Sequence, residues 1–127
     1  MILVDTGVII DFWKKPTDKK KQVFLKEETA ICGVVKAELM HGAKDENQLR
    51  AIKEALSDFK YIPMEENLWE NIGTMLFRLR KRGIAVPFQD VIISALALNY
   101  NLVIWSNDKH FKLIKKEFPI LKLFEQK

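Results

Sequence analysis

The stretch Ile2-Leu3-Val4-Asp5-Thr6 joins three strand-favouring apolar residues to a carboxylate at the point where the strand should end. A continuous apolar run of this kind is typical of a short strand that is buried on both faces of a parallel sheet. In open α/β sheets the ligand crevice lies beyond the carboxyl ends of the strands. Asp5 is therefore a candidate functional residue, although an Asp at this place also fits a helix cap.

The size and composition of the chain indicate one globular domain. Its 127 residues, 48% of them hydrophobic, suffice for a single core and are too few for two ordinary domains, so we expect one domain over residues 1–127. The lone Cys32 excludes an internal disulfide and fits a reducing compartment. We see no signal peptide before the first strand, and the apolar run 91–105 is too short to span a bilayer. We therefore expect a soluble, cytoplasmic protein.

The charge of the chain is mildly basic, with a formal net charge of +4 at pH 7. This balance permits a polyanionic partner without requiring one. One group of cations follows the Asp5 segment and is a candidate to contact RNA phosphates: Lys14, Lys15, Lys19, Lys20 and Lys21. Another group stands where a long helix should end, a position that the helix dipole favours for cations in any case: Arg78, Arg80, Lys81 and Arg82.

Strand and helix patterns alternate along the chain. Short apolar runs predict further strands at residues 29–32, 60–63, 102–105 and 120–124, and helical periodicity predicts helices at 7–13, 33–43, 65–82, 91–98 and 109–117. A short helix is also expected around residues 19–25, and a capping pattern at Asp45 opens another that ends near Phe59. The apolar stripe of helix 65–82 predicts a core or subunit contact, as we also expect for Trp13, Trp69 and Trp105. This alternation predicts an α/β fold with a parallel sheet and helices on both faces.

Three more acids fall at equivalent places in this pattern. Glu38 follows the second strand, Asp90 opens the apolar helix, and Asp108 follows the fourth strand. If the first, second and fourth strands are neighbours, these acids and Asp5 converge in one crevice. Clustered carboxylates repel each other unless a cation lies between them, and Mg²⁺ or Mn²⁺ prefers such oxygen ligands. The chemistry that follows is metal-assisted hydrolysis of a phosphodiester.

Four segments together resemble the PIN domain, and their compact spacing resembles the VapC-type toxins of toxin-antitoxin pairs. They are V-D-T-G-V-I-I-D at 4–11, E-L-M-H-G at 38–42, P-F-Q-D-V-I-I-S-A at 87–95 and V-I-W-S-N-D-K-H-F at 103–111. The resemblance implies a PIN-like parallel sheet in the order 3-2-1-4-5. It also implies the toxin of a type II pair: a homodimeric endoribonuclease that depends on Mg²⁺ or Mn²⁺, cleaves RNA and is neutralised by a VapB-type antitoxin.

The resemblance also assigns roles to single residues. The catalytic acids of the family fall on Asp5, Glu38, Asp90 and Asp108. Of these, the resemblance makes Asp5, Asp90 and Asp108 the metal ligands, while Glu38 would act through water or a second metal.

Several neighbouring residues have supporting roles in the same comparison. Thr6 is expected to hydrogen-bond Asp5 or a water at the metal, or else to cap a helix. Ser106 stands where the family usually has Thr and keeps the hydroxyl. Asp11 fits a structural or positioning role better than a metal ligand, and the role of Asn107 stays open.

Other functions remain open on the sequence alone. A PIN-like nuclease that processes RNA or cuts DNA has the same residues. A receiver-like module that holds Mg²⁺ without catalysis would need an adjacent acidic pair after the first strand, which is absent, and a haloacid-dehalogenase-type phosphatase would need an Asp where this chain has Gly7. His41 and His110 show no zinc-protease spacing.

Overall fold

Five short strands form one parallel sheet in the order β3-β2-β1-β4-β5. The computed structural model describes residues 1–125, so the last two residues of the predicted domain lie outside the described residues. The sheet order that the PIN resemblance implied is confirmed. The strands are β1 (Ile2–Val4), β2 (Thr29–Cys32), β3 (Lys60–Ile62), β4 (Val103–Trp105) and β5 (Lys122–Leu123).

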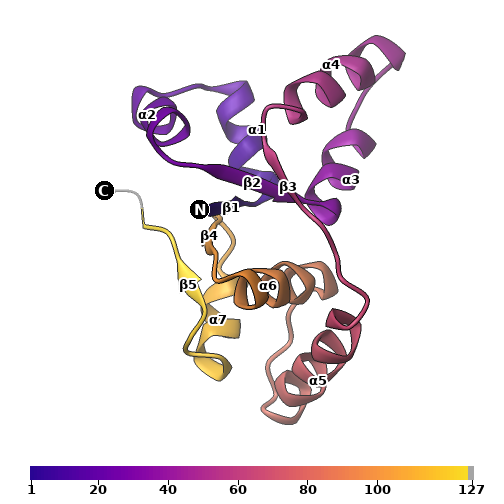
Figure 1. Cartoon of the computed structure of the whole chain (residues 1–127), viewed down its shortest axis with the longest axis vertical. Coiled ribbons are helices and arrows are strands. Elements are labelled where there is room, and N and C mark those ends of the chain that lie inside the picture. The colour runs from indigo at the N-terminus through magenta and orange to yellow at the C-terminus, as the bar shows by residue number, and fades with distance from the viewer. Residues whose placement is uncertain (126–127) are drawn as a thin grey trace.

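Helices cover both faces of the sheet, as the α/β pattern predicted. One face carries α1 (Thr6–Lys14), α2 (Asp18–Lys26), α3 (Gly33–His41) and α4 (Glu46–Leu56), and the other carries α5 (Leu68–Lys81), α6 (Phe88–Tyr100) and α7 (His110–Glu117) (Figure 1). The chain runs one way across the sheet from β1 to β3, and then the other way from β3 to β4 and β5. Right-handed crossovers in the two directions place helices on opposite faces.

Several predicted boundaries were wrong by a few residues, and three of them have a clear physical reason. Phe88, predicted as linker, is the first residue of α6, because Pro87 before it already has the φ of −61° and the extended ψ that suit a helix start. The predicted third strand loses Pro63, which has no N–H to pair. The fifth strand shortens to two residues, and Ile120 before it is largely exposed.

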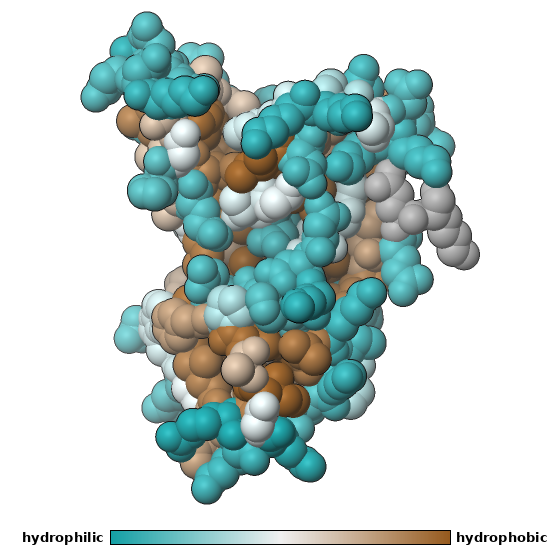
Figure 2. Space-filling model, turned by 180° about the vertical axis from the view of Figure 1, so that it is seen from behind, coloured by the Kyte–Doolittle hydropathy of each residue, from teal (hydrophilic) through white to brown (hydrophobic). Residues whose placement is uncertain are grey.

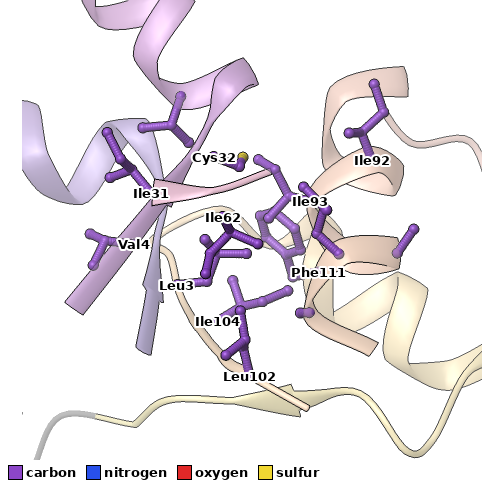
Figure 3. Close-up of a cluster of buried hydrophobic side chains, with 14 of the residues drawn as sticks. Leu3, Val4, Ile31, Cys32, Ile62, Ile92, Ile93, Leu102, Ile104 and Phe111 are labelled. Carbon is purple, nitrogen blue, oxygen red and sulfur yellow. The ribbon is translucent and has the colours of Figure 1, made fainter. Parts of the chain in front are cut away.

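The core is built around β1 and α6. Leu3 and Val4 are fully buried, and side chains from β1, β2, β4 and α6 meet in one cluster (Figure 3). Every residue from Asp90 to Ala97 is buried, which confirms that α6 is central. Cys32 and Trp105 are buried as predicted. Trp13 and Trp69 are not core residues of the isolated chain, because 39% and 46% of their surfaces are exposed.

The opposite end of the molecule from α4 exposes apolar surface. Figure 2 shows brown, apolar residues gathered over the half of the molecule that α5 to α7 form, with charged residues around them. The exposed aromatic residues of α5 are Trp69 and Phe77. The apolar stripe of α5 is core, because Leu68, Ile72 and Leu79 are buried, and a subunit contact at the exposed side of α5 stays a prediction. None of the helices in residues 1–125 combines the length and apolar composition that crossing a bilayer requires.

Strand register aligns the carboxyl ends of β1 and β4. Val4 pairs with Trp105, and the backbone N–H of Asp5 donates to the carbonyl of Trp105 over 2.9 Å, so the ladder continues one residue past the strand. Asp5 and Ser106 therefore leave the sheet side by side.

Candidate active site

Asp5 is fixed by two hydrogen bonds of different origin. It caps α1, since one carboxylate oxygen accepts the backbone N–H of Thr6 over 2.9 Å. Its other oxygen accepts the hydroxyl of Ser106 over 2.7 Å. The two sequence interpretations of Asp5, helix cap and site residue, are thus both compatible with the structure. Burial raises the pKa of the Asp5 carboxyl above its ordinary value, although the Ser106 and Thr6 hydrogen bonds lower it and the charge of Asp108 adds to the rise.

Ser106 joins Asp5 to Asp108. While its hydroxyl donates to Asp5, its Oγ accepts the backbone N–H of Asp108 over 2.9 Å. A threonine hydroxyl could do the same, so the exchange of the family's usual Thr for Ser keeps this link. Partial burial works against ionisation of Asp108, but the backbone N–H and side chain of His110 outweigh it and hold the pKa of that carboxyl below its ordinary value.

Asp90 enters the same cluster from the first turn of α6. It is only 5% exposed, and burial together with the charges of Asp108 and Asp5 raises the pKa of its carboxyl to about 7. His110 lowers this pKa, but by less than the other causes raise it. The structure therefore brings Asp5, Asp90 and Asp108 into one electrostatic neighbourhood. Three acids on separate elements meet there, as expected from the sequence.

Glu38 lies at the margin of this group. Its Oε1 accepts the hydroxyl of Thr6 over 3.1 Å, and its side chain is exposed on α3. Thr6 is the first residue of α1 and not its cap, so the alternative that Thr6 is the N-cap was wrong. With its backbone N–H on Asp5 and its hydroxyl on Glu38, Thr6 connects the two acids. Glu38 thus stands beside the buried acids, not among them.

Asp11 and Asn107 are joined by a hydrogen bond between their side chains. The amide of Asn107 donates to the Asp11 carboxylate over 2.8 Å, and this bond ties the loop after β4 to the second turn of α1. Asp11 therefore faces the loop and is not part of the buried cluster. This contact supports the positioning role expected for Asp11, and it supplies the role that the sequence left open for Asn107.

His110 is the residue that the sequence interpretation missed. It was considered only for zinc-protease spacing, yet it opens α7 two residues after Asp108. Its Nδ1 lies 2.6 Å from Asp108 Oδ1 and 3.4 Å from Asp90 Oδ2. The signal was present in the segment N-D-K-H-F, where a histidine and an acid are two positions apart at the end of a strand. One ligand atom each from Asp90, Asp108 and His110 lie within 4.8 Å of one another.

The donor atoms fit a divalent cation. Asp90 Oδ2 is buried and accepts no hydrogen bond within residues 1–125, which is costly for a carboxylate oxygen surrounded by other acids. Ser94, one helical turn further along α6, also carries a buried hydroxyl without a partner. Oxygen-rich clusters of this kind suit Mg²⁺ or Mn²⁺. An ion here would give the unpartnered oxygen a partner and remove the repulsion among the carboxylates.

The lysines that follow the Asp5 segment begin at the end of α1 that is far from Asp5. α1 starts beside the site and ends at Lys14, about 13 Å along its axis, so Lys14 and Lys15 are at the far end of that helix. Their contact with RNA stays a prediction. Arg78 and Arg82 are exposed at the end of α5, as expected for a solvated helix end, and both also contact the Glu117 carboxylate of α7 over 3.2 Å. They join two helices, while Arg80 and Lys81 lie over the exposed Phe77 ring.

A named protein and two solved structures are similar to this chain over nearly its whole length. The chain is 29% identical to a protein named Ribonuclease VapC1 from Methanocaldococcus jannaschii over 126 residues, which cover 98% of this chain and 88% of the relative. It superposes on a chain of the DNA-bound VapBC crystal structure from Salmonella typhimurium with a TM-score of 0.86, at 20% identity and with 99% and 98% of the two chains covered. VapBC-1 from nontypeable Haemophilus influenzae gives a TM-score of 0.81 at 23% identity, with 99% and 98% covered.

The structural likenesses are at low identity and concern the fold alone. The family comparison goes further, because the model of the PIN domain matches residues 2–117. This range runs from the first residue of β1 to the last residue of α7, and it includes all four acids that the sequence singled out. The chain therefore belongs to the PIN domain family.

Proposed function

We propose that this protein is the toxin of a type II toxin-antitoxin pair and acts as an endoribonuclease that requires Mg²⁺ or Mn²⁺. The observation that carries the proposal is the convergence of Asp5, Asp90 and Asp108, with a buried Asp90 oxygen that has no partner among the described residues. The relative from Methanocaldococcus jannaschii is named a ribonuclease, and the matched Salmonella and Haemophilus structures are of VapBC. These names support the same assignment.

In this proposal the buried Asp5 and Asp90 hold the ion together with the partly exposed Asp108, and their neighbours orient them. Ser106 fixes the Asp5 carboxylate and the backbone of Asp108 at once, so that both face the same point. When bound, the divalent ion supplies charge neutralisation at the phosphodiester and activation of water for in-line attack. Glu38, exposed and held by Thr6, remains available to orient water at the edge of the site.

The protein partners belong to the same proposal. We expect a VapB-type antitoxin and a second copy of this chain to bind it. The exposed aromatic residues Trp69 and Phe77 on α5 support an apolar protein contact, and the net charge of +4 is compatible with RNA as substrate. We further propose that residues 1–127 act as one domain.

An RNA cleavage assay tests the activity. The purified chain should cut RNA with Mg²⁺ or Mn²⁺ and lose this activity in EDTA. Asp5→Asn should lower the rate at least about 100-fold, because it removes a charged ligand while the amide still fits the cap position. Asp58→Asn, an exposed acid beyond α4, is the matched control and should cut at the wild-type rate.

Three results would contradict the proposal. Cleavage that persists in EDTA would remove the metal requirement, and cleavage that survives Asp5→Asn would place the chemistry elsewhere. Cleavage of duplex DNA with intact RNA under the same conditions would replace the ribonuclease with a DNA nuclease. For the toxin role, expression of the wild-type chain should arrest bacterial growth, and Asp5→Asn should relieve the arrest at equal protein level.

A further inference from the structure

The imidazole of His110 faces the two acids without a hydrogen bond. Its Nδ1 is buried and has no hydrogen-bond partner within the described residues, although Asp108 Oδ1 lies 2.6 Å away and Asp90 Oδ2 3.4 Å away. At these distances a protonated imidazole pairs with the carboxylates, whereas a neutral one with its proton on Nε2 presents them the Nδ1 lone pair. Asp108 Oδ1 already accepts the backbone N–H of His110 over 2.9 Å. The Nδ1 atom thus lies close to an oxygen of each carboxylate.

Three electron-rich atoms therefore converge on one point. Asp90 is more than nine-tenths buried, and its Oδ2 is itself unpartnered, so the group is not simply an exposed cluster of acids. When the ring proton is on Nε2, the lone pair of Nδ1 points into the same space as the lone pairs of the carboxylates. A cation between them would satisfy all three atoms at once.

The fold holds these atoms in place. Asp108 and His110 lie two residues apart where the chain enters α7, and the backbone bond between them fixes the relative position of the two side chains. Asp90 comes from α6, which packs against α7. The trio therefore comes from the first turns of two packed helices and from the short segment between β4 and α7, and it does not depend on a long loop.

A nitrogen atom changes which ion the site prefers. Mg²⁺ demands oxygen ligands in near-octahedral geometry, whereas imidazole nitrogen suits later first-row ions. Affinity of a mixed nitrogen and oxygen site rises from Mn²⁺ through Fe²⁺ and Co²⁺. Given the metal site of the proposed function, on which this inference rests, we propose that His110 Nδ1 is a direct ligand beside Asp90 and Asp108. This ligand gives the site a preference for Mn²⁺ or a later divalent transition ion over Mg²⁺.

Pulsed electron paramagnetic resonance of bound Mn²⁺ tests the ligand without an activity assay. Spin-echo modulation reports a nitrogen atom that is bonded directly to the ion. The wild-type chain with one equivalent of Mn²⁺ should show ¹⁴N modulation, and selective ¹⁵N labelling of histidine should change its frequencies. His110→Phe, which keeps an aromatic ring but offers no nitrogen ligand, should lose the signal. His41→Gln, an exposed histidine on α3, is the matched control and should keep it.

Metal competition by calorimetry tests the preference. His110→Asn offers an amide oxygen near the position of Nδ1. It should lower Mn²⁺ and Co²⁺ affinity by roughly 10- to 100-fold and change Mg²⁺ affinity far less. Thermal unfolding of each metal-free variant shows that it is folded before binding is measured. Equal losses of Mn²⁺ and Mg²⁺ affinity in His110→Asn would overturn the preference.

The outcomes separate this inference from the proposed function. Bound Mn²⁺ without nitrogen modulation overturns the role of His110 and leaves a metal-dependent ribonuclease intact. Nitrogen modulation in a chain that does not cut RNA supports the ligand and contradicts the ribonuclease. A wild-type chain that binds no divalent ion contradicts both.

Discussion

Asp90 and Glu117 are both nearly buried carboxylates on the same face of the sheet, and their surroundings are opposite. The side chain of Asp90 is 7% exposed and that of Glu117 is 11% exposed. Glu117 receives the guanidinium groups of Arg78 and Arg82, each at 3.2 Å. Asp90 faces two other acids and has only the imidazole of His110 nearby, 3.4 Å from an oxygen that has no hydrogen-bond partner in the described part of the chain.

The difference shows which of the two carboxylates contributes to the stability of the fold. A paired buried carboxylate is compensated within the chain, and losing one partner leaves the other exposed to a desolvation cost. A buried carboxylate among like charges costs free energy of folding until something from outside compensates it. Glu117 therefore belongs to the stability of the α5–α7 contact, and Asp90 belongs to a site that is complete only with a cation. This contrast can be tested from both sides.

The largest effect is expected from Asp90→Asn. Cleavage of RNA should fall at least about 100-fold, because a ligand charge is lost. The metal-free protein should at the same time unfold at a higher temperature than wild type, since the neutral amide ends the repulsion with Asp108 and Asp5. Activity is measured with Mg²⁺ and Mn²⁺, and unfolding by calorimetry in EDTA. A variant that is both inactive and less stable would show that Asp90 is a structural residue like Glu117.

Glu117→Gln should give the reverse result. The amide cannot neutralise both guanidinium groups, and Arg78 and Arg82 stand one turn apart on α5, where like charges repel. We expect a loss of about 1–2 kcal/mol in the free energy of unfolding, at the low end for buried pairs because the arginines are exposed. Urea denaturation measures it, while the RNA cleavage rate at 25 °C should stay at the wild-type value. A large drop in rate without unfolding would remove the separation between the two regions.

The pH dependence of the metal-free protein should come from the acid cluster. The pKa of Asp90 is about 7 in the folded chain and near 3.8 when unfolded, so between these values the folded state binds the extra proton. Its stabilising contribution is present below pH 3.8 and is lost as the pH rises through about 7. Asp5, whose pKa is also raised, acts in the same direction, and Asp108 acts only at more acid pH.

Metal-free wild type should therefore lose roughly 1 kcal/mol of stability between pH 5.5 and pH 8, after allowance for screening. Thermal unfolding in EDTA across this range measures the loss. Saturating Mn²⁺ should reduce the difference, because the ion takes the place of the proton, and Asp90→Asn should reduce it without any metal. If Glu117→Gln removed the pH dependence of stability instead, the titrating group would belong to the Glu117 region and not to the acid cluster.

The fold could be predicted because its signals are local. β1 and β2 are continuous apolar runs with a turn or helix signal after them, and their bounds follow directly from the sequence. The predicted bounds failed where pairing decides them, as at β5, whose two residues depend on contact with β4. The exposure of Trp13 and Trp69 could not be predicted either, because an amphipathic stripe does not say which of its border residues the neighbouring helix covers.

The site could be predicted only in outline. That Asp5, Asp90 and Asp108 converge follows from where two parallel strands end and a buried helix begins. The bonds among them depend on side-chain distances that spacing does not set: Ser106 between two acids, and Asn107 on Asp11. His110 was not predicted for the same reason, since its role depends on a contact with Asp90, which is distant in sequence and close in space.

The smallest effect is expected from Arg82→Gln. This variant tests whether Arg78 and Arg82 both compensate the charge of Glu117. Arg82 is 71% exposed, so its ion pair is screened by water, and its loss should cost about 0.5 kcal/mol in the free energy of unfolding. Arg80→Gln is the matched control, because Arg80 lies over Phe77 and not on Glu117, and it should change less. Combined with Glu117→Gln, Arg82→Gln should add almost nothing, since its partner charge is already gone. Additive losses in the double variant would mean that Arg82 stabilises α5 independently of Glu117. Arg78 alone would then compensate the charge of Glu117.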